Sequence, residues 1–504
     1  MRTPTPLDMR DVPTVPRRRA TVAHCGHETT DDVRCKGVVA VSSLGVSVRR
    51  RAIGRVAIVA GVIASLVPVA SAGAQAGPSS FPAPAVSGPI AGTVPGDPQA
   101  PAVADTYPFF STWVDLAGNG YVEEEFYVDG LADAFATDGT AVAADVPYRT
   151  RIVVRRPADD RDFNGTVLLE WQNVTAGYDL DALWSPEHMM RSGYAWVGVS
   201  AQRVGVNQLR TWSPARYGSL DVTGGGAYLT DQLSYDIFAQ AASAVRDPAG
   251  VAPLGNLTVD QVLAIGASQS AGRMRIYYDV VLPQVTPVFD GYAFIVGAAP
   301  SRVGPEPVIQ VLSETDVRSP AGRRTDSDVF RRWEVAGTAH SGHAGQVYRA
   351  PLAERDLGGV TEYECSAPPF SRVPLGQVVN AAYDHLARWA AGGPVPPSAP
   401  YLTFAPDGSK VRNELGLAQG GIQLSQVSVP IARNTGDNSG ASFCVLFGTH
   451  VPFDDATLDE LYSSHGRYVA DVHAADRANV RAGYIVMADA AANHQAAVHS
   501  DIGN

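Results

Sequence analysis

The sequence predicts an α/β fold with a mostly parallel central sheet, flanked by helices and followed by a C-terminal extension. Three observations support this prediction: strand-like apolar runs alternate with helical segments, one strand ends in a tight serine-containing turn, and two later strands end in acids and in a histidine. Alternating strands and helices favour parallel sheets with right-handed crossovers. Such sheets hold their reactive groups at the carboxyl ends of the strands.

The predicted elements follow one another along the chain. Short β-rich runs predict strands at 151–155, 166–171, 195–200, 262–265, 292–296, and within 307–316 and 330–340. Apolar residues at helical spacing predict helices at 231–245 and 378–391. Beyond about residue 399, strands at 401–404 and 443–447 and helices at 455–481 and 487–498 predict an extension packed on the core, with an independent domain as the alternative.

The run from Val262 to Ile265 leads into the most informative segment of the chain. It stops at Gly266, turns through Ser268 and continues as a helix, which is the pattern of a nucleophile elbow. A frame shifted by two residues would make Ser270 the nucleophile instead, and a serine-rich helix cap without chemistry is the third interpretation. We favour Ser268, because the apolar strand ends directly before Gly266.

A serine hydrolase of this kind needs an acid and then a histidine after the serine. Asp316 and Glu314 both follow a predicted strand; we favour Asp316 as the acid that orients the base and keep Glu314 as the alternative. His340 follows the next strand and is the expected base, with His343 as the second choice. No adjacent acid or third ligand gives these histidines the spacing of a metal site.

An oxyanion hole would combine two backbone N–H groups. The first candidate is Gln269, directly after the proposed nucleophile, and the second is Asn173 or Val174 in the loop after Trp171. The segment Trp171-Gln-Asn is explained equally well as a buried strand end whose side-chain amide is hydrogen-bonded and has no catalytic role.

Several segments resemble a family of largely uncharacterised α/β-hydrolase-domain proteins. The resemblance rests on the residues 171–174, 194–202, 266–273, 310–317, 333–340 and 444–448, and on Pro452-Phe453 with the acidic helix after it. It extends over about residues 105–490 and implies an α/β-hydrolase fold with esterase-type chemistry. It implies no particular substrate, and the family also carries a small residue where this chain has Ser270.

Composition and the N-terminal region limit the function further. The 504 residues carry a net charge of −12, which argues against a nucleic-acid partner. Residues 49–76 resemble a secretory signal, which predicts a secreted protein without a stable membrane span after cleavage. Residues 1–48, which precede this segment, are expected to be a disordered extension, which a start codon assigned too far upstream would explain. The alternative is a cytoplasmic tail. Residues 77–104 resemble a Pro/Ala-rich linker, so the hydrolase domain is expected over 105–500.

Only Cys365 and Cys444 follow the signal segment. Two cysteines in an oxidising compartment are expected to pair, the alternative being one exposed and one buried thiol.

The leading functional hypothesis is a secreted hydrolase of carboxylic esters that needs no metal and no organic cofactor. Its substrate would be a small-molecule, lipid or carbohydrate ester. An acyltransferase would use the same residues, because the two activities differ only in whether water or an alcohol reaches the acyl-enzyme. A non-catalytic envelope or carbohydrate-binding protein on the same fold is the alternative from another class.

Overall fold

The computed structural model describes residues 83–92 and 106–503, all within the unit that runs from Ala74 to Asn504. The expected extension 1–48 and signal segment 49–76 lie outside the described residues, as does most of the expected linker 77–104. Within that linker, Ala85–Ser87 forms the short strand β1, which pairs antiparallel with β2 (Tyr121–Phe135) and buries Val86.

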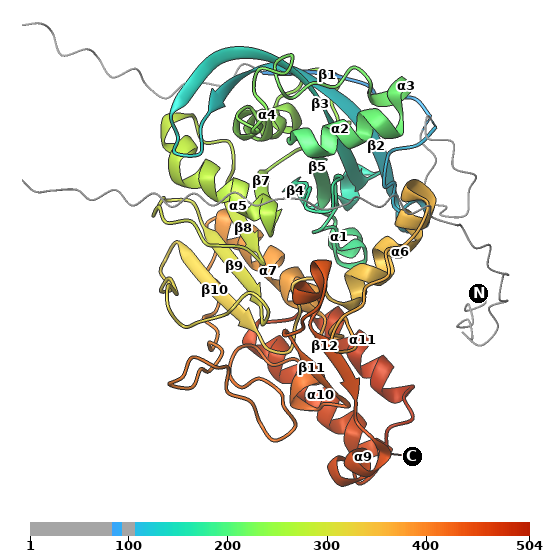
Figure 1. Ribbon diagram of the computed structural model, residues 1–504. Coiled ribbons are helices and arrows are strands. Elements are labelled where there is room, and N and C mark those ends of the chain that lie inside the picture. Colours follow the sequence, from blue (N-terminus) through green and yellow to red (C-terminus); the bar gives the residue numbers. More distant parts are fainter. Residues whose placement is uncertain (1–82, 93–105, 504) are drawn as a thin grey trace, which may run out of the picture. The chain divides into compact units, whose positions relative to one another are not determined.

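The centre of the fold is a sheet of ten strands (Figure 1). Its order is β10-β9-β8-β7-β4-β5-β3-β2-β1-β6, and the six strands from β10 to β5 run parallel. This agrees with the predicted α/β fold. The remaining strands are β3 (Ala141–Pro157), β4 (Thr166–Trp171), β5 (Ala195–Val199), β6 (Ala249–Gly250), β7 (Gln261–Ala267), β8 (Gly291–Ile295), β9 (Val308–Ser313) and β10 (Phe330–Val335).

Helices cover both faces of the sheet, because successive residues of its buried strands point to opposite sides. Along β7, Val262 and Ala264 pack into one core with residues of α4 and α5, whereas Leu263 and Ile265 pack into a second core with α7. The helices are α1 (Pro186–Ser192), α2 (Arg203–Trp212), α3 (Pro214–Tyr217), α4 (Ser234–Arg246), α5 (Gln269–Ile276), α6 (His343–Leu357), α7 (Leu375–Ala390), α8 (Ser425–Ser428), α9 (Asp455–Leu461), α10 (His465–Ala482) and α11 (Met487–Val498). Four further elements are 3₁₀ helices, η1 (Ala117–Asn119), η2 (Asp160–Asp162), η4 (Leu282–Gln284) and η5 (Ser442–Leu446), and η3 (Tyr277–Val281) is a π-helix that follows α5 directly.

The antiparallel side of the sheet is a long hairpin of β2 and β3 that bends over α4 (Figure 1). Its turn contains Asp138 and Gly139; the glycine has a φ of 85°, and the Asp138 carboxylate accepts the N–H of Thr140 at 2.9 Å. Sequence analysis predicted only 151–155 of this hairpin, although an Asp-Gly pair between two long β-rich runs is a hairpin signal.

The C-terminal segment differs from its prediction in three places. Of the expected strand 443–447, residues 443–446 belong to the 3₁₀ helix η5. A short apolar run has no periodicity that distinguishes a strand from a helical turn. Residues 401–404 contribute only isolated bridges, while β11 (Ala432–Thr435) and β12 (Thr449–Pro452) form a small antiparallel pair. The expected helix 455–481 is two helices, since Ser464 caps α10 through its side chain.

The C-terminal segment shares a core with the sheet. Leu402, Ile422 and Leu424 are buried together with Trp333 and Val335 of β10. Ala490 of α11 belongs to the same core, whereas Tyr462, Tyr468, Val472 and Ala497 form a separate cluster among the elements drawn in red in Figure 1.

Candidate active site

Ser268 lies at the tip of a sharp turn between β7 and α5. Its backbone angles are φ 56° and ψ −115°, a conformation that residues other than glycine rarely adopt. Its N–H donates to the carbonyl of Ile295 on β8 at 3.0 Å, which holds the turn against the sheet. Strained backbone of this kind persists where the surrounding structure imposes it, and it is frequent at reactive sites.

Small residues make this turn possible. A Cβ on Gly266 would stand 3.1 Å from the backbone N of Ala271, and a Cβ on Gly297 would stand 2.5 Å from the Ala271 side chain. The start of α5 can therefore approach the ends of β7 and β8 only if both positions are glycine. Gly297 was not singled out in the sequence, because only the pairing of β7 with β8 shows that it faces the turn.

Ser270 occupies a different environment from Ser268. It is fully buried, and its hydroxyl donates to the carbonyl of Ala267 at 2.9 Å while accepting the N–H of the same residue at 3.1 Å. Ser268 is half-buried. The hydroxyl that solvent or a substrate can reach in this turn is thus that of Ser268, whereas that of Ser270 closes the strand end.

Asp316 and His340 are brought together from the ends of two neighbouring strands. Asp316 follows β9, His340 follows β10, and His340 Nδ1 lies 2.7 Å from Asp316 Oδ1. The other carboxylate oxygen accepts the hydroxyl of Ser313 at 2.5 Å, and the His340 N–H donates to Thr315 Oγ1 at 3.2 Å. Both partners of the pair are therefore held by the same strand end, which orients the imidazole.

Glu314 does not reach His340. It is fully buried, and its two oxygens accept the N–H of Gly337 at 2.7 Å and the guanidinium of Arg412 at 2.6 Å. This arginine comes from the C-terminal segment, 98 residues further along the chain. Glu314 thus joins the turn after β10 to the C-terminal segment.

The three strand ends lie along one edge of the sheet. Ala267 pairs with Ile295, Ile295 with Val311, and Val311 with Trp333, so β7, β9 and β10 end at a similar level. Within the described residues, no hydrogen bond joins the Ser268 hydroxyl to His340. Such contacts are often long in unliganded sites and shorten when substrate binds.

The segment after β4 lies against the serine turn. The side-chain amide of Asn173 donates to the carbonyl of Ala267 at 2.8 Å, and the N–H of Val174 lies 3.5 Å from Gln269 Oε1. The N–H of Gln269 is in the first turn of α5, where backbone donors have no acceptor inside the helix. Of the two candidates for the second oxyanion-hole donor, Asn173 hydrogen-bonds the segment to the end of β7, and Val174 directs its N–H towards the side chain of Gln269.

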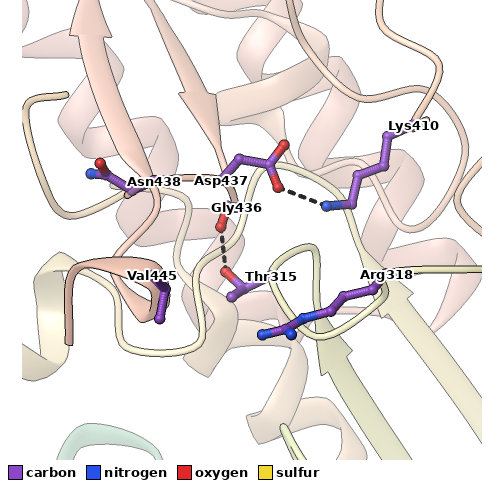
Figure 2. A pocket seen from close by; sticks show the side chains of 7 residues that line it. All are labelled: Thr315, Arg318, Lys410, Gly436, Asp437, Asn438 and Val445. Atoms are coloured by element: carbon purple, nitrogen blue, oxygen red, sulfur yellow. Dashed lines mark hydrogen bonds and ion pairs between the residues drawn. The ribbon is translucent and has the colours of Figure 1, made fainter. Parts of the chain in front are cut away.

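A pocket of about 320 Å³ opens beside Thr315 and Arg318, which lie on either side of Asp316 in the sequence. Figure 2 shows the side chains that line this pocket. The hydroxyl of Thr315 donates to the carbonyl of Gly436 at 2.6 Å, and Lys410 pairs with Asp437 at 2.8 Å. Its lining consists of Thr315, Arg318, Lys410, Gly436, Asp437, Asn438 and Val445. Ser268 is not among these residues, so the pocket adjoins the acid and not the serine.

The predicted cysteine pair forms a disulfide bond between Cys365 and Cys444. It ties η5 to the segment before α7. The carbonyls of Leu446 and Phe447, at the end of η5, accept the N–H groups of Ser341 at 2.9 Å and Ser371 at 2.9 Å. The bond therefore supports the loop that follows His340.

Over residues 83–92 and 106–503, no group of three or more histidine, cysteine or acidic side chains could hold a metal ion. Within the same ranges, no helix has the length and apolar character needed to cross a bilayer.

Solved structures similar to this chain include a prolyl endopeptidase, an esterase and a putative dienelactone hydrolase. A prolyl endopeptidase is 12% identical with a TM-score of 0.26 and is matched over 48% of this chain and 38% of its own. The esterase Est22 is 10% identical with a TM-score of 0.29, over 48% of this chain and 79% of that chain. A putative dienelactone hydrolase from Klebsiella pneumoniae subsp. pneumoniae MGH 78578 is 11% identical with a TM-score of 0.21, and the match covers 40% of this chain and 75% of that chain. The chain thus spans little more than a third of the prolyl endopeptidase.

Comparison with protein families gives a broader match. No curated protein matches the chain. The alpha/beta hydrolase domain family, in contrast, matches it over residues 86–495, which includes the whole sheet apart from Ala85 and every residue of the site described above. This match supports a hydrolase, and the chain therefore belongs to the alpha/beta hydrolase domain family.

Proposed function

We propose that the protein is a serine hydrolase of carboxylic esters, with Ser268 as nucleophile, His340 as general base and Asp316 as the acid that orients it. The observation that carries this proposal is the strained turn at Ser268 on the same sheet edge as the Asp316–His340 pair. A serine hydroxyl is a weak nucleophile until a base accepts its proton, and an oriented imidazole is such a base.

In the proposed reaction, Ser268 Oγ attacks the ester carbonyl while His340 Nε2 takes the hydroxyl proton. His340 then donates that proton to the departing alcohol, which leaves an acyl group on Ser268. Water attacks the acyl-enzyme with the same histidine as base, and the carboxylic acid is released. Asp316 holds the Nδ1 proton of His340 and stabilises the imidazolium at each step.

The oxyanion of the tetrahedral intermediate would accept the N–H groups of Gln269 and Val174. The side-chain oxygen of Gln269 now lies 3.5 Å from the Val174 nitrogen, which is longer than an ordinary N–H···O bond. A carbonyl oxygen of the substrate can therefore replace it at little cost. The negative oxygen would also lie at the N-terminus of α5, where the helix dipole favours negative charge.

Labelling with a fluorophosphonate tests the nucleophile directly. We expect one labelled site at Ser268 in the wild type and none in Ser268→Ala, together with loss of hydrolysis of a short 4-nitrophenyl ester. Ser270→Ala is the matched control, because it removes a neighbouring hydroxyl that is buried and bonded to Ala267. Labelling that survives in Ser268→Ala and disappears in Ser270→Ala would show that the other frame is correct.

We also propose that the protein is exported through the segment 49–76. The disulfide between Cys365 and Cys444 supports this, because such bonds persist mainly in oxidising compartments. N-terminal sequencing of protein recovered outside the cytoplasm should find a start after Ala72 or Ala76. Recovery of residues 1–48 on the exported protein would contradict the proposal.

A further inference from the structure

An arginine from α6 binds the residue that follows the proposed base in the chain. Arg349 Nη2 donates to the hydroxyl of Ser341 at 3.1 Å, and Gln346 Nε2 donates to the same oxygen at 2.9 Å. Ser341 follows His340 in the chain, and its N–H is held by the carbonyl of Leu446 at 2.9 Å. The guanidinium is thus placed at the loop that carries the base.

Gly345 leaves the space that the Arg349 side chain occupies. Both terminal nitrogens of Arg349 lie 3.1 Å from the point where a Cβ on Gly345 would stand. A glycine inside a helix costs about 1 kcal/mol relative to alanine, so its presence in α6 calls for a reason, and room for the guanidinium supplies one. The side chain folds towards the N-terminus of α6, where the helix dipole is positive.

The charge of Arg349 is not matched by a nearby carboxylate. Among residues 83–92 and 106–503, no acidic oxygen lies within 4.0 Å of its guanidinium nitrogens. Asp181 is the acid that acts on it most strongly; its Oδ2 accepts Arg155 at 2.7 Å and the Tyr348 hydroxyl at 2.7 Å, and its Oδ1 makes no hydrogen bond to Arg349. Burial accordingly lowers the pKa of Arg349, and Asp181 opposes this only in part.

A second arginine adds to the positive charge at this end of α6. Arg372 is exposed, and its charge, added to the effect of burial, lowers the pKa of both His343 and His450. His343 is the first residue of α6 and donates its N–H to the carbonyl of Ser371 at 3.0 Å. Arg349 and Arg372 therefore both place positive charge near the N-terminal end of α6.

Two tyrosines influence the charge of Arg349. Tyr178 and Tyr363 are both close enough for their phenols to interact electrostatically with the guanidinium. Tyr178 packs on Phe110 with ring centroids 5.0 Å apart, and Tyr363 packs on Phe447 at 4.6 Å. Arg349 thus interacts with Tyr178 of the segment that follows Val174 and with Tyr363, which precedes Cys365 of the disulfide.

We propose that Arg349, with Ser341 and Gln346, binds a carboxylate of the substrate, so that the enzyme prefers esters that carry a second, anionic group. The proposal rests on the proposed serine-esterase function. A guanidinium presents paired donors that match the two oxygens of a carboxylate, and such charge-assisted bonds are stronger than neutral ones. Arg349 would select the substrate without touching the scissile carbonyl.

Two matched pairs of esters test this proposal. In the first, the acyl group carries the charge: mono-4-nitrophenyl adipate is compared with its methyl ester. In the second, the alcohol carries the charge: a 4-acetoxybenzoate is compared with its methyl ester. The wild type should favour the anionic member of at least one pair in kcat/KM, mainly through KM, by about tenfold to a hundredfold, as expected for one charge-assisted contact.

Variants separate this subsite from the chemistry. Arg349→Met should remove the preference, and Arg349→Lys should keep part of it. Arg477→Met is the control, because Arg477 is exposed on α10 and its replacement removes the same charge elsewhere. Equal loss on both members of each pair in Arg349→Met, or a wild type without any preference, would overturn the proposal. Activity that persists in Ser268→Ala would instead overturn the proposed function.

Discussion

His340 and Asp316 lie 24 residues apart in the chain, yet His340 Nδ1 and Asp316 Oδ1 are 2.7 Å apart in the structure. They meet because β9 and β10 are adjacent and parallel, so that the loops after them leave the sheet at the same edge. The pair also depends on its neighbours: Ser313 holds the second carboxylate oxygen, and Thr315 accepts the backbone N–H of the histidine.

Replacing the two acids should have different consequences. Asp316→Asn should lower the rate of ester hydrolysis by about 10³- to 10⁴-fold, because the asparagine favours the wrong imidazole tautomer. Glu314→Gln should keep most of the activity of the folded protein but lower the free energy of unfolding by about 1–3 kcal/mol, because Arg412 and Gly337 lose a charged acceptor. Kinetics and urea denaturation of both variants check this. An inactive, fully stable Glu314→Gln would show that the acids are assigned in the wrong order.

Of two variants that lack the Ser268 hydroxyl, Ser268→Gly should be more stable than Ser268→Ala. The φ of 56° and ψ of −115° cost a residue with a side chain about 1–3 kcal/mol, whereas glycine adopts them freely. We therefore expect Ser268→Gly to be about 1 kcal/mol more stable than Ser268→Ala in denaturant titrations. At Ser270, inside α5, the order should reverse, since glycine is about 1 kcal/mol worse than alanine in a helix. The same order at both positions would argue against strain at the turn.

Removing the disulfide should destabilise the protein. The bond joins residues separated by 79 positions, and closing a loop of that length is worth about 4 kcal/mol on the chain-entropy model. A double Cys365→Ala and Cys444→Ala variant should therefore unfold at lower urea concentration than the oxidised wild type. Dithiothreitol should shift the wild type and leave the variant unchanged. Equal midpoints for the oxidised wild type and the variant would mean that the bond adds no stability.

His450 should make stability depend on pH. Burial, with help from Arg372 and His343, lowers its pKa from 6.5 to about 4. Between these values the unfolded chain binds a proton that the folded protein does not, so the free energy of unfolding should fall as pH falls from about 6.5 to about 4, and the contribution should be complete above 6.5.

A substitution can isolate this effect. His450→Asn should reduce the slope of unfolding free energy against pH in that window, whereas His499→Asn, at an exposed position after α11, should not. Chemical denaturation at a series of pH values gives both slopes. An unchanged slope in His450→Asn would assign the pH dependence to other groups.

Local sequence was sufficient for the elements whose signals are local. The apolar run before Gly266 and the small residues after Ser268 predicted the turn, because only small side chains fit where α5 approaches the sheet. The strands 166–171 and the helix 487–498 have the predicted bounds, since each is a regular apolar pattern with clear ends. The fold class followed from the alternation of such elements.

Tertiary structure decided what depended on distant residues. Glu314 and Asp316 are two acids at one strand end, and the sequence does not show which of them binds the histidine. The structure distinguishes them, because Arg412, 98 residues from Glu314, binds Glu314 and leaves Asp316 for His340. The run 443–447 became a 3₁₀ turn and not a strand, and its place beside Cys365 comes from the folded chain. Arg349 reaches Ser341, the residue after the proposed base, from α6. Sequence alone therefore determined which residue types stand at the strand ends, because backbone propensity and periodicity are local. The partners of those residues were decided by contacts between distant segments, which no local pattern encodes.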